Sequence, residues 1–168
     1  MIFRLSQKLS VRIKAGALPT LALDENPLAD WSAALFVVGR TPYILLSNTK
    51  SLYSTVMPGK GVADEGEFTV RALGSIRDFL QRDGRGAVYE RLIAPATDTV
   101  NFARALNRSV TGSITDLTKQ AAYLLAAGDA SLFEVASRLN ETPMSALKHD
   151  GSSHGFPRDV FRALADRQ

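Results

Sequence analysis

The order in which two hydrophobic periodicities follow one another along the chain constrains the fold most strongly. Three short β-type runs lie at 34–38, 43–46 and 52–57, separated by turn-forming residues. From residue 64 onwards, apolar residues recur instead at the spacing of three and four that one face of a helix requires. Strands followed by helices predict an α+β fold, in which a small antiparallel β-meander packs against a predominantly helical C-terminal two-thirds.

Domain organisation and further elements follow from the same periodicity. With 168 residues the chain fits one domain, strand-rich over 1–62 and helical over 63–168. The run at 52–57 also fits a helical spacing, but its Tyr, Thr and Val residues favour a strand. We also expect a strand at 2–5, a short helix after Ser6, an ambiguous segment at 87–93, and helices from Asp64 to Asp83-Gly84 and over 114–127, 132–139, 144–148 and 156–165.

Composition excludes several classes of site. No cysteine is present, which excludes disulfides, thiolate metal sites and cysteine nucleophiles, and makes a cytosolic location the simplest expectation. No apolar run approaches the roughly 18 residues of a membrane helix, and the first ten residues are too charged for a signal peptide. The net charge is +3, and its surplus lies within residues 1–62. Such a small surplus is weak evidence for nucleic-acid binding.

The densest polar patch is LNRSVTGSITDL, residues 106–117, directly before an apolar helical segment. Ser113 and Asp116 have the spacing of a helix cap with an acidic partner, which predicts a helix beginning at Ile114. The alternative is a site for an anion or polar ligand at that helix start, although no P-loop motif occurs and Asp116 would compete with an anion. Capping by Ser113 assigns no role to Arg108 or to Asn107 beside it. The candidate ligand-binding residues are Asn107, Arg108, Ser109, Thr111 and Ser113.

A second polar cluster is LDENPLADW, residues 23–31, directly before the predicted meander. Three carboxylates within seven residues can hold Mg²⁺ or act as acid and base, but further ligands would have to come from elsewhere. The structural alternative is a turn at the Asn-Pro pair and an Asp that orients the entry into the strand. The candidate residues are Asp24, Glu25, Asn26, Asp30 and Trp31.

A basic face is expected on the first strand and the helix that follows it. These side chains could contact nucleic-acid phosphates. The alternative is that they only solvate an exposed helix face, as lysine and arginine commonly do. The candidate residues are Arg4, Lys8, Arg12 and Lys14.

The segment SLFEVASRLNETPMSALK, residues 131–148, resembles a bacterial helix-turn-helix, with Thr142-Pro143 opening the second helix. Asn140 stands where such motifs usually have a turn glycine. A plain helical hairpin over one end of the core is the other interpretation. The side chains that the second helix would offer to bases are Ser145, Lys148 and His149.

No metal or cofactor site is predicted. The two histidines, His149 and His154, lie five residues apart without a cysteine or a helical carboxylate motif, so they make a poor zinc pair. No G-x-S-x-G motif places a serine nucleophile.

Three motifs carry a resemblance to a known family: LDENP-x-x-DW, YILLSNTKSLYS and ALNRSVTGS-x-x-DL, together with the opening MIFRLSQKL. With them the chain resembles an uncharacterised family of small bacterial proteins of unknown function over residues 1–148. The resemblance implies a stand-alone bacterial cytoplasmic domain, and it implies no activity, cofactor or catalytic residue.

Two hypotheses for function follow. The first is a non-enzymatic binding or accessory protein of the cytoplasm that contacts a protein or a nucleic acid, and no membrane. The second is a metal- or phosphate-dependent enzyme, in which the DENP loop (residues 24–27) and the NRSVTGS segment (residues 107–113) form one cleft. The enzyme requires these two segments to meet in space.

Overall fold

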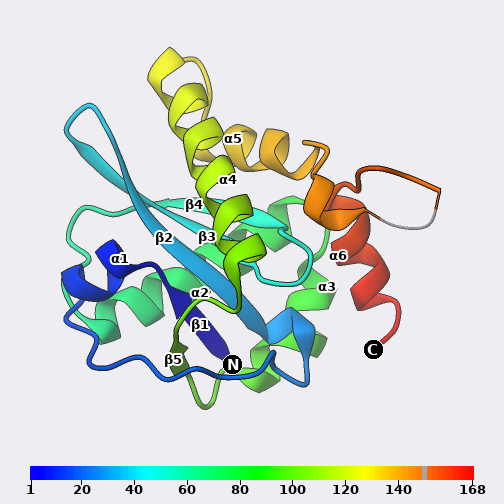
Figure 1. Ribbon diagram of the computed structural model, residues 1–168, viewed down its shortest axis with the longest axis horizontal. Coiled ribbons are helices and arrows are strands. Elements are labelled where there is room, and N and C mark those ends of the chain that lie inside the picture. The colour runs from blue at the N-terminus through cyan, green and yellow to red at the C-terminus, as the bar shows by residue number, and fades with distance from the viewer. Residues whose placement is uncertain (149–150) are drawn as a thin grey trace.

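The computed structural model describes residues 1–148 and 151–168, and a five-stranded mixed sheet lies at its centre (Figure 1). The strand order is β4-β3-β2-β1-β5. The antiparallel meander is present as β2, β3 and β4, but β1 pairs in parallel with both β2 and β5. The α+β class is therefore confirmed, whereas a purely antiparallel sheet is wrong. The strands are β1 (Ile2–Leu5), β2 (Asp30–Val38), β3 (Thr41–Asn48), β4 (Ser54–Pro58) and β5 (Asn101–Ala103).

The parallel pairings of β1 with β2 and β5 could not be predicted from the sequence because β1 and β5 are short. β5 has three residues, too few to show an alternation of apolar and polar side chains. β1 has four residues, and all of them are buried because the strand lies between β2 and β5. Periodicity predicts a strand but not its neighbours in the sheet.

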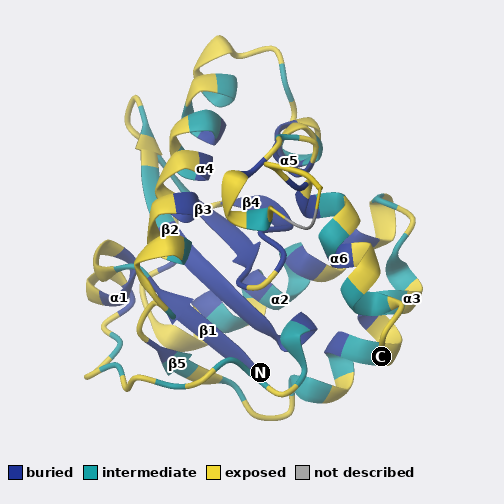
Figure 2. Cartoon of the chain, turned by 45° about the vertical axis from the view of Figure 1, so that its right-hand side comes forward, coloured by how far each residue is buried: buried dark blue, intermediate teal, exposed yellow. Residues whose placement is uncertain are grey.

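Helices cover both faces of the sheet, so the strands are the most continuously buried part of the chain (Figure 2). One buried cluster joins β1, β2 and β3 to α2 and α6 through Phe3, Phe68 and Phe161. The other joins β3 and β4 to α4 and α5 through Leu45, Leu117 and other apolar residues. The helices are α1 (Gln7–Arg12), α2 (Glu65–Arg82), α3 (Gly86–Val88), α4 (Arg108–Ala127), α5 (Leu132–Asn140) and α6 (Pro157–Ala165), with 3₁₀ turns at Pro27–Ala29, Ala94–Ala96 and Ser145–Leu147 and a π turn at Tyr89–Ile93.

The start of α4 differs from the prediction. The helix begins at Arg108, because the Asn107 side chain accepts a hydrogen bond from the Val110 amide at 3.0 Å and caps it. Ser113 therefore lies inside the helix, where its hydroxyl donates to the carbonyl of Ser109 at 3.1 Å. The prediction that Ser113 caps a helix from Ile114 was wrong, because an upstream Asn caps a helix as well as a Ser.

The segment after α5 also differs from the prediction. α5 begins with a capping box formed by Ser131 and Glu134. No second α-helix follows it over residues 144–148: Met144 instead forms a β-bridge with Gly155, and a short 3₁₀ turn follows. The helix-turn-helix and the plain helical hairpin were therefore both wrong, since the second segment is a short 3₁₀ turn and not an α-helix.

One buried ion pair joins β1 to β2. The Arg4 guanidinium donates to both carboxylate oxygens of Asp30, at 2.8 and 2.7 Å, and both side chains are buried. It also donates to the carbonyls of Leu21, Ala22 and Arg104. These five bonds match the five N–H donors of a guanidinium, so no donor is left unsatisfied. A β1 side chain thus holds two loops and β2 together.

We expect single substitutions in this pair to destabilise the protein strongly. Arg4→Met leaves the Asp30 carboxylate buried without its partner, which costs about 3–5 kcal/mol of unfolding free energy. The double variant Arg4→Met/Asp30→Leu removes both charges and should lose less than the sum of the single substitutions. Urea unfolding measures these differences. Lys8→Met on the exposed side of α1 is the matched control, expected within about 0.5 kcal/mol of the wild type. Additive losses in the double variant would contradict a direct coupling.

Candidate functional site

The predicted basic face is smaller in the structure. Arg4 is buried against Asp30 and cannot contact a phosphate, so its inclusion in that face was wrong. Lys8, Arg12 and Lys14 are exposed. Arg12 nevertheless donates to the carbonyls of Gly59 and Val62, at 3.2 and 2.9 Å. The basic face is thus reduced to Lys8, Lys14 and Arg12, and the Arg12 guanidinium is already hydrogen-bonded to two main-chain carbonyls.

The polar residues of the LDENPLADW cluster (residues 23–31) bind one another and neighbouring main-chain groups. The buried Asp30 carboxylate accepts from Arg4 and from the Asp24 amide, and Asp24 in turn accepts from the Asn26 amide at 2.9 Å. Asn26 caps the following 3₁₀ turn. The buried Trp31 indole donates to the carbonyl of Leu28 at 2.8 Å, and Glu25 is exposed. The structure therefore does not gather these carboxylates around a common point.

The NRSVTGS segment lies elsewhere. Arg108 is exposed at the start of α4, and none of its N–H groups binds another residue in the described part of the chain. Two hollows border the segment. One, of about 190 Å³, is lined by Asn107, Ser109 and Ser113 with Thr49, and the other, of about 230 Å³, includes Thr111. Neither hollow includes a residue of the DENP loop.

The described residues offer no metal site. Within 1–148 and 151–168, no three His, Asp or Glu side chains come together in an arrangement that holds a metal ion. His154 is exposed beside the hydroxyl of Ser153, at 2.8 Å from its Nδ1, and His149 lies outside the described residues.

The outer edge of β4 borders a hollow that residues 55–58 line. Gly59 donates to Pro42, and Asn48 donates to the carbonyl of Tyr53. Because strand residues alternate, Ser54, Val56 and Pro58 therefore point their main-chain groups away from β3. A free sheet edge of this kind is available for pairing with another chain.

Side chains close both ends of this edge. Asn140 accepts from the Ser54 amide at 2.7 Å and donates to the Ser54 carbonyl at 2.9 Å, as a neighbouring strand would. Proline at position 58 has no amide hydrogen, and its carbonyl accepts from Arg71 at 2.7 Å. Between them, the amide and carbonyl of Val56 make no hydrogen bond with any described residue. A single peptide position on this edge is left unpaired.

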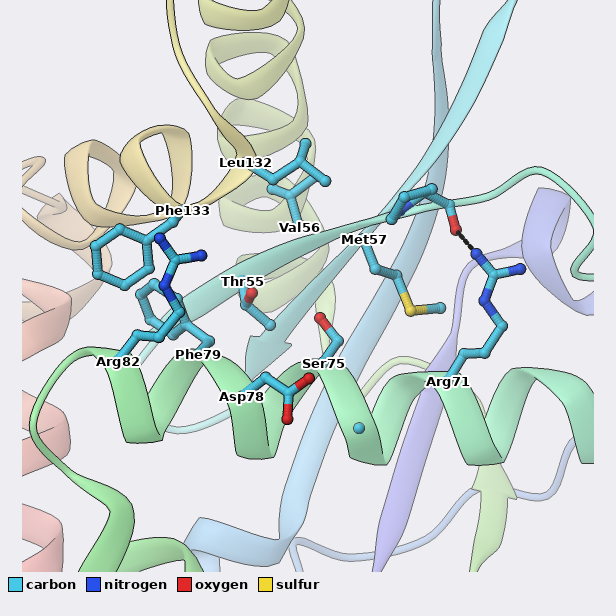
Figure 3. Close-up of a pocket in the computed structure, with 12 residues that line it drawn as sticks. Thr55, Val56, Met57, Arg71, Ser75, Asp78, Phe79, Arg82, Leu132 and Phe133 are labelled. Carbon is cyan, nitrogen blue, oxygen red and sulfur yellow. Dashed lines mark hydrogen bonds between the residues drawn. The ribbon is translucent and has the colours of Figure 1, made fainter.

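The unpaired position lines a groove of about 350 Å³ between α2 and α5, which we call the β4 groove (Figure 3). Arg71 lies at one end and Phe133 beside Arg82 at the other. The α2 wall is a single helical stripe, because its residues recur at spacings of three and four. This stripe consists of Arg71, Gly74, Ser75, Asp78 and Arg82; the strand and α5 contribute Thr55, Val56, Met57, Pro58, Leu132 and Phe133, and Phe79 of α2 completes the lining.

Gly74 is the residue in this wall that the fold itself does not explain. It lies in the interior of an 18-residue helix, where glycine costs about 0.8–1.0 kcal/mol relative to alanine. A Cβ added there would meet no atom within 4 Å, so no neighbour requires the missing side chain. The space above Gly74 belongs to the β4 groove.

Arg82 supplies a positive charge at the end of the β4 groove. Its guanidinium carbon lies 4.1 Å from the centre of the Phe133 ring, a cation–π contact that holds the side chain in place. It makes no hydrogen bond or ion pair with another described residue. The nearby Glu134 carboxylate is bound by Ser131, and these bonds lower its pKa, with smaller contributions from Arg138 and Arg82.

Chemistry rather than volume distinguishes the β4 groove from the other hollows. A hollow of about 560 Å³ lies beneath α1, but its one arginine, Arg104, already donates to the carbonyl of Leu18 at 3.0 Å. The β4 groove combines an unpaired main-chain amide and carbonyl with apolar walls and a free guanidinium. It can therefore bind a ligand, but it contains no paired acid and base or activated nucleophile.

No residue of the β4 groove was predicted as a site residue from the sequence. The edge position of β4 depends on the strand order, which periodicity does not give. One signal was nevertheless available, because Gly74 interrupts a helix that was predicted in full.

Comparison with known families confirms the resemblance to an uncharacterised family. The model of a family described as a domain of unknown function, DUF6933, matches residues 2–160. The chain belongs to this family. No curated protein matches the chain. The DUF6933 match covers all five strands and both walls of the β4 groove. In the described part of this DUF6933 chain, no helix has the length and apolar character needed to cross a membrane.

Asn140 should be important for stability because it closes the sheet edge. Asn140→Ala leaves the buried amide and carbonyl of Ser54 without partners, which costs about 1–3 kcal/mol of unfolding free energy. Asn140→Asp retains the acceptor for the amide but loses the donor, so it should also destabilise. Chemical denaturation measures both. The control is Asn107→Ser, which retains a good helix cap at an exposed site and should change stability little. An Asn140→Ala variant as stable as the wild type would contradict this role.

Proposed function

We propose that this chain is a non-enzymatic binding protein and that its ligand occupies the β4 groove. The observation that carries the proposal is the unpaired main-chain position at Val56, located between two positions that side chains have closed. Buried main-chain groups are nearly always hydrogen-bonded. Val56 lines the β4 groove and its amide and carbonyl have no partner among the described residues, so a ligand in the groove can bond to both.

The enzymatic alternative has less support. It needs the DENP and NRSVTGS segments to share a cleft, yet neither hollow beside NRSVTGS contains a DENP residue. The Asp30 carboxylate is committed to Arg4. The nucleic-acid version of the binding hypothesis is weakened by the same ion pair, because it removes Arg4 from the basic face.

A cytosolic setting forms part of the proposal. A chain without cysteine has no disulfide to gain from an oxidising compartment.

Filling the β4 groove at Gly74 tests the proposal. A random octapeptide display library is selected against the protein, and the enriched peptides are titrated against Gly74→Leu. Leucine is a better helix former than glycine, so this variant should be at least as stable as the wild type. We expect affinity to fall by roughly tenfold or more, because the new side chain occupies the space of the ligand.

Gly112→Leu is the matched control. Gly112 is also a helix-interior glycine, on α4, with no atom within 4 Å of an added Cβ, and it does not line the β4 groove. This variant should bind the selected peptides as the wild type does. Equal binding by Gly74→Leu, or a library without enrichment over a protein-free selection, would overturn the proposal.

A further inference from the structure

We infer that the ligand of the β4 groove is an extended peptide segment of a protein partner, paired through its main chain with Val56 and carrying an acidic side chain that Arg82 binds. This inference rests on the proposed function and specifies the chemical class of its ligand. Three features of the groove support it independently: the main-chain pairing site, the space above the helix, and the free charge.

The main-chain site favours a peptide because it offers a donor and an acceptor from one residue. In an antiparallel β-ladder, the two residues of a hydrogen-bonded pair exchange both of their main-chain bonds with each other. The amide and carbonyl of Val56 present this pair along the outer edge of β4. Addition of a strand to a sheet edge is an established form of peptide recognition, in which main-chain bonds give affinity and side-chain pockets give specificity.

The closed ends limit how much strand can be added. Asn140 occupies the main-chain groups of Ser54, and Arg71 occupies the carbonyl of Pro58. A peptide therefore pairs at one position rather than along the whole strand. The α2 wall from Arg71 to Arg82 is about 16 Å long at 1.5 Å per residue. An extended peptide of about five residues matches that length at 3.3 Å per residue.

The space above Gly74 suits a main chain. A helix wall that carries a glycine lets a ligand backbone approach more closely than any side chain would allow. The apolar side chains of Met57, Leu132 and Phe133 line the same groove and can bury one ligand side chain. A ligand that satisfies both features has a main chain with alternating side chains, which describes an extended peptide.

The charge at the end of the β4 groove favours an acidic side chain. Arg82 is held against Phe133 while its hydrogen-bond donors remain free of other described residues. Arg71, at the other end, is already bound to the carbonyls of Pro58 and Lys60 and to Glu67. Asp78 lines the wall between them and accepts from Arg77 at 3.0 Å. An extended peptide with its carboxylate beside Arg82 avoids placing that charge against Asp78.

Removal of the Arg82 charge tests the acidic preference. The peptides enriched on the wild-type protein should carry Asp or Glu at one fixed position. Replacing that residue by Asn or Gln should weaken binding roughly three- to fivefold, as expected for an exposed charged pair. With Arg82→Gln the same replacement should change affinity little. Lys119→Gln, at an exposed position of α4 outside the groove lining, should retain the full acidic preference.

Removal of one peptide amide hydrogen at a time tests the main-chain pairing. A selected peptide is synthesised as a series, each member N-methylated at one residue. Methylation of the residue opposite Val56 should weaken binding by roughly tenfold or more, because a main-chain bond is lost and a methyl group is inserted. In the same complex, hydrogen exchange of the Val56 amide should become slower than in the free protein.

The outcomes separate this inference from the proposed function. Peptides that lose affinity for Gly74→Leu but show no acidic preference, or no methylation-sensitive position, would overturn the inference while the β4 groove stays a binding site. Peptides that bind Gly74→Leu and the wild type equally would overturn both. An acidic preference that survives in Arg82→Gln would assign the carboxylate to another residue and contradict the inference.

Discussion

The buried pair between Arg4 and Asp30 is the constraint on which the rest of the structure depends. It fixes the parallel pairing of β1 with β2, and it holds the loop carbonyls of Leu21 and Ala22 beside the sheet. Buried ion pairs add little net stability compared with apolar replacements, but breaking one is expensive. Such a pair therefore selects one arrangement of the strands over others. Hydrophobic contacts alone would allow the short β1 strand to shift.

The polar character of Arg4 continues across one face of the sheet. The pairing registers place Arg4 beside Ser32, Ser32 beside Ser47, and Ser47 beside Ser54. All four are buried, and Ser54 donates to the hydroxyl of Ser47 at 2.9 Å. Asn140 ends this row by bonding to the main chain of Ser54. Each buried polar group in the row has a partner, since Arg4 bonds to Asp30 and Ser32 to Thr49 at 2.9 Å. The bonds of Ser54 then join β4 to β3 and to α5.

Local periodicity could predict the meander, α2 and α6, because each has many residues with a regular apolar spacing. It could not predict which strands are neighbours. Arg4 illustrates the reason, since a charged residue within a four-residue strand indicates a solvent-facing position until its buried partner is known. The start of α4 was misplaced because Asn107 and Ser113 are both good caps, and only the three-dimensional structure shows which one is used.

The candidate site is a consequence of topology for the same reason. β4 becomes an edge only because β1 and β5 were added to the opposite side of the meander. An exposed edge is a hazard for aggregation, which proteins reduce with proline, charged side chains or a covering element. Here Pro58, Arg71 and Asn140 provide that protection at the two ends of the edge. The middle of the edge, at Val56, is not protected. A side chain at position 74 would have had space to cover it, because an added Cβ there meets no atom within 4 Å. The edge is therefore closed against long strands and open to a short one, which is the selectivity that a peptide-binding groove requires.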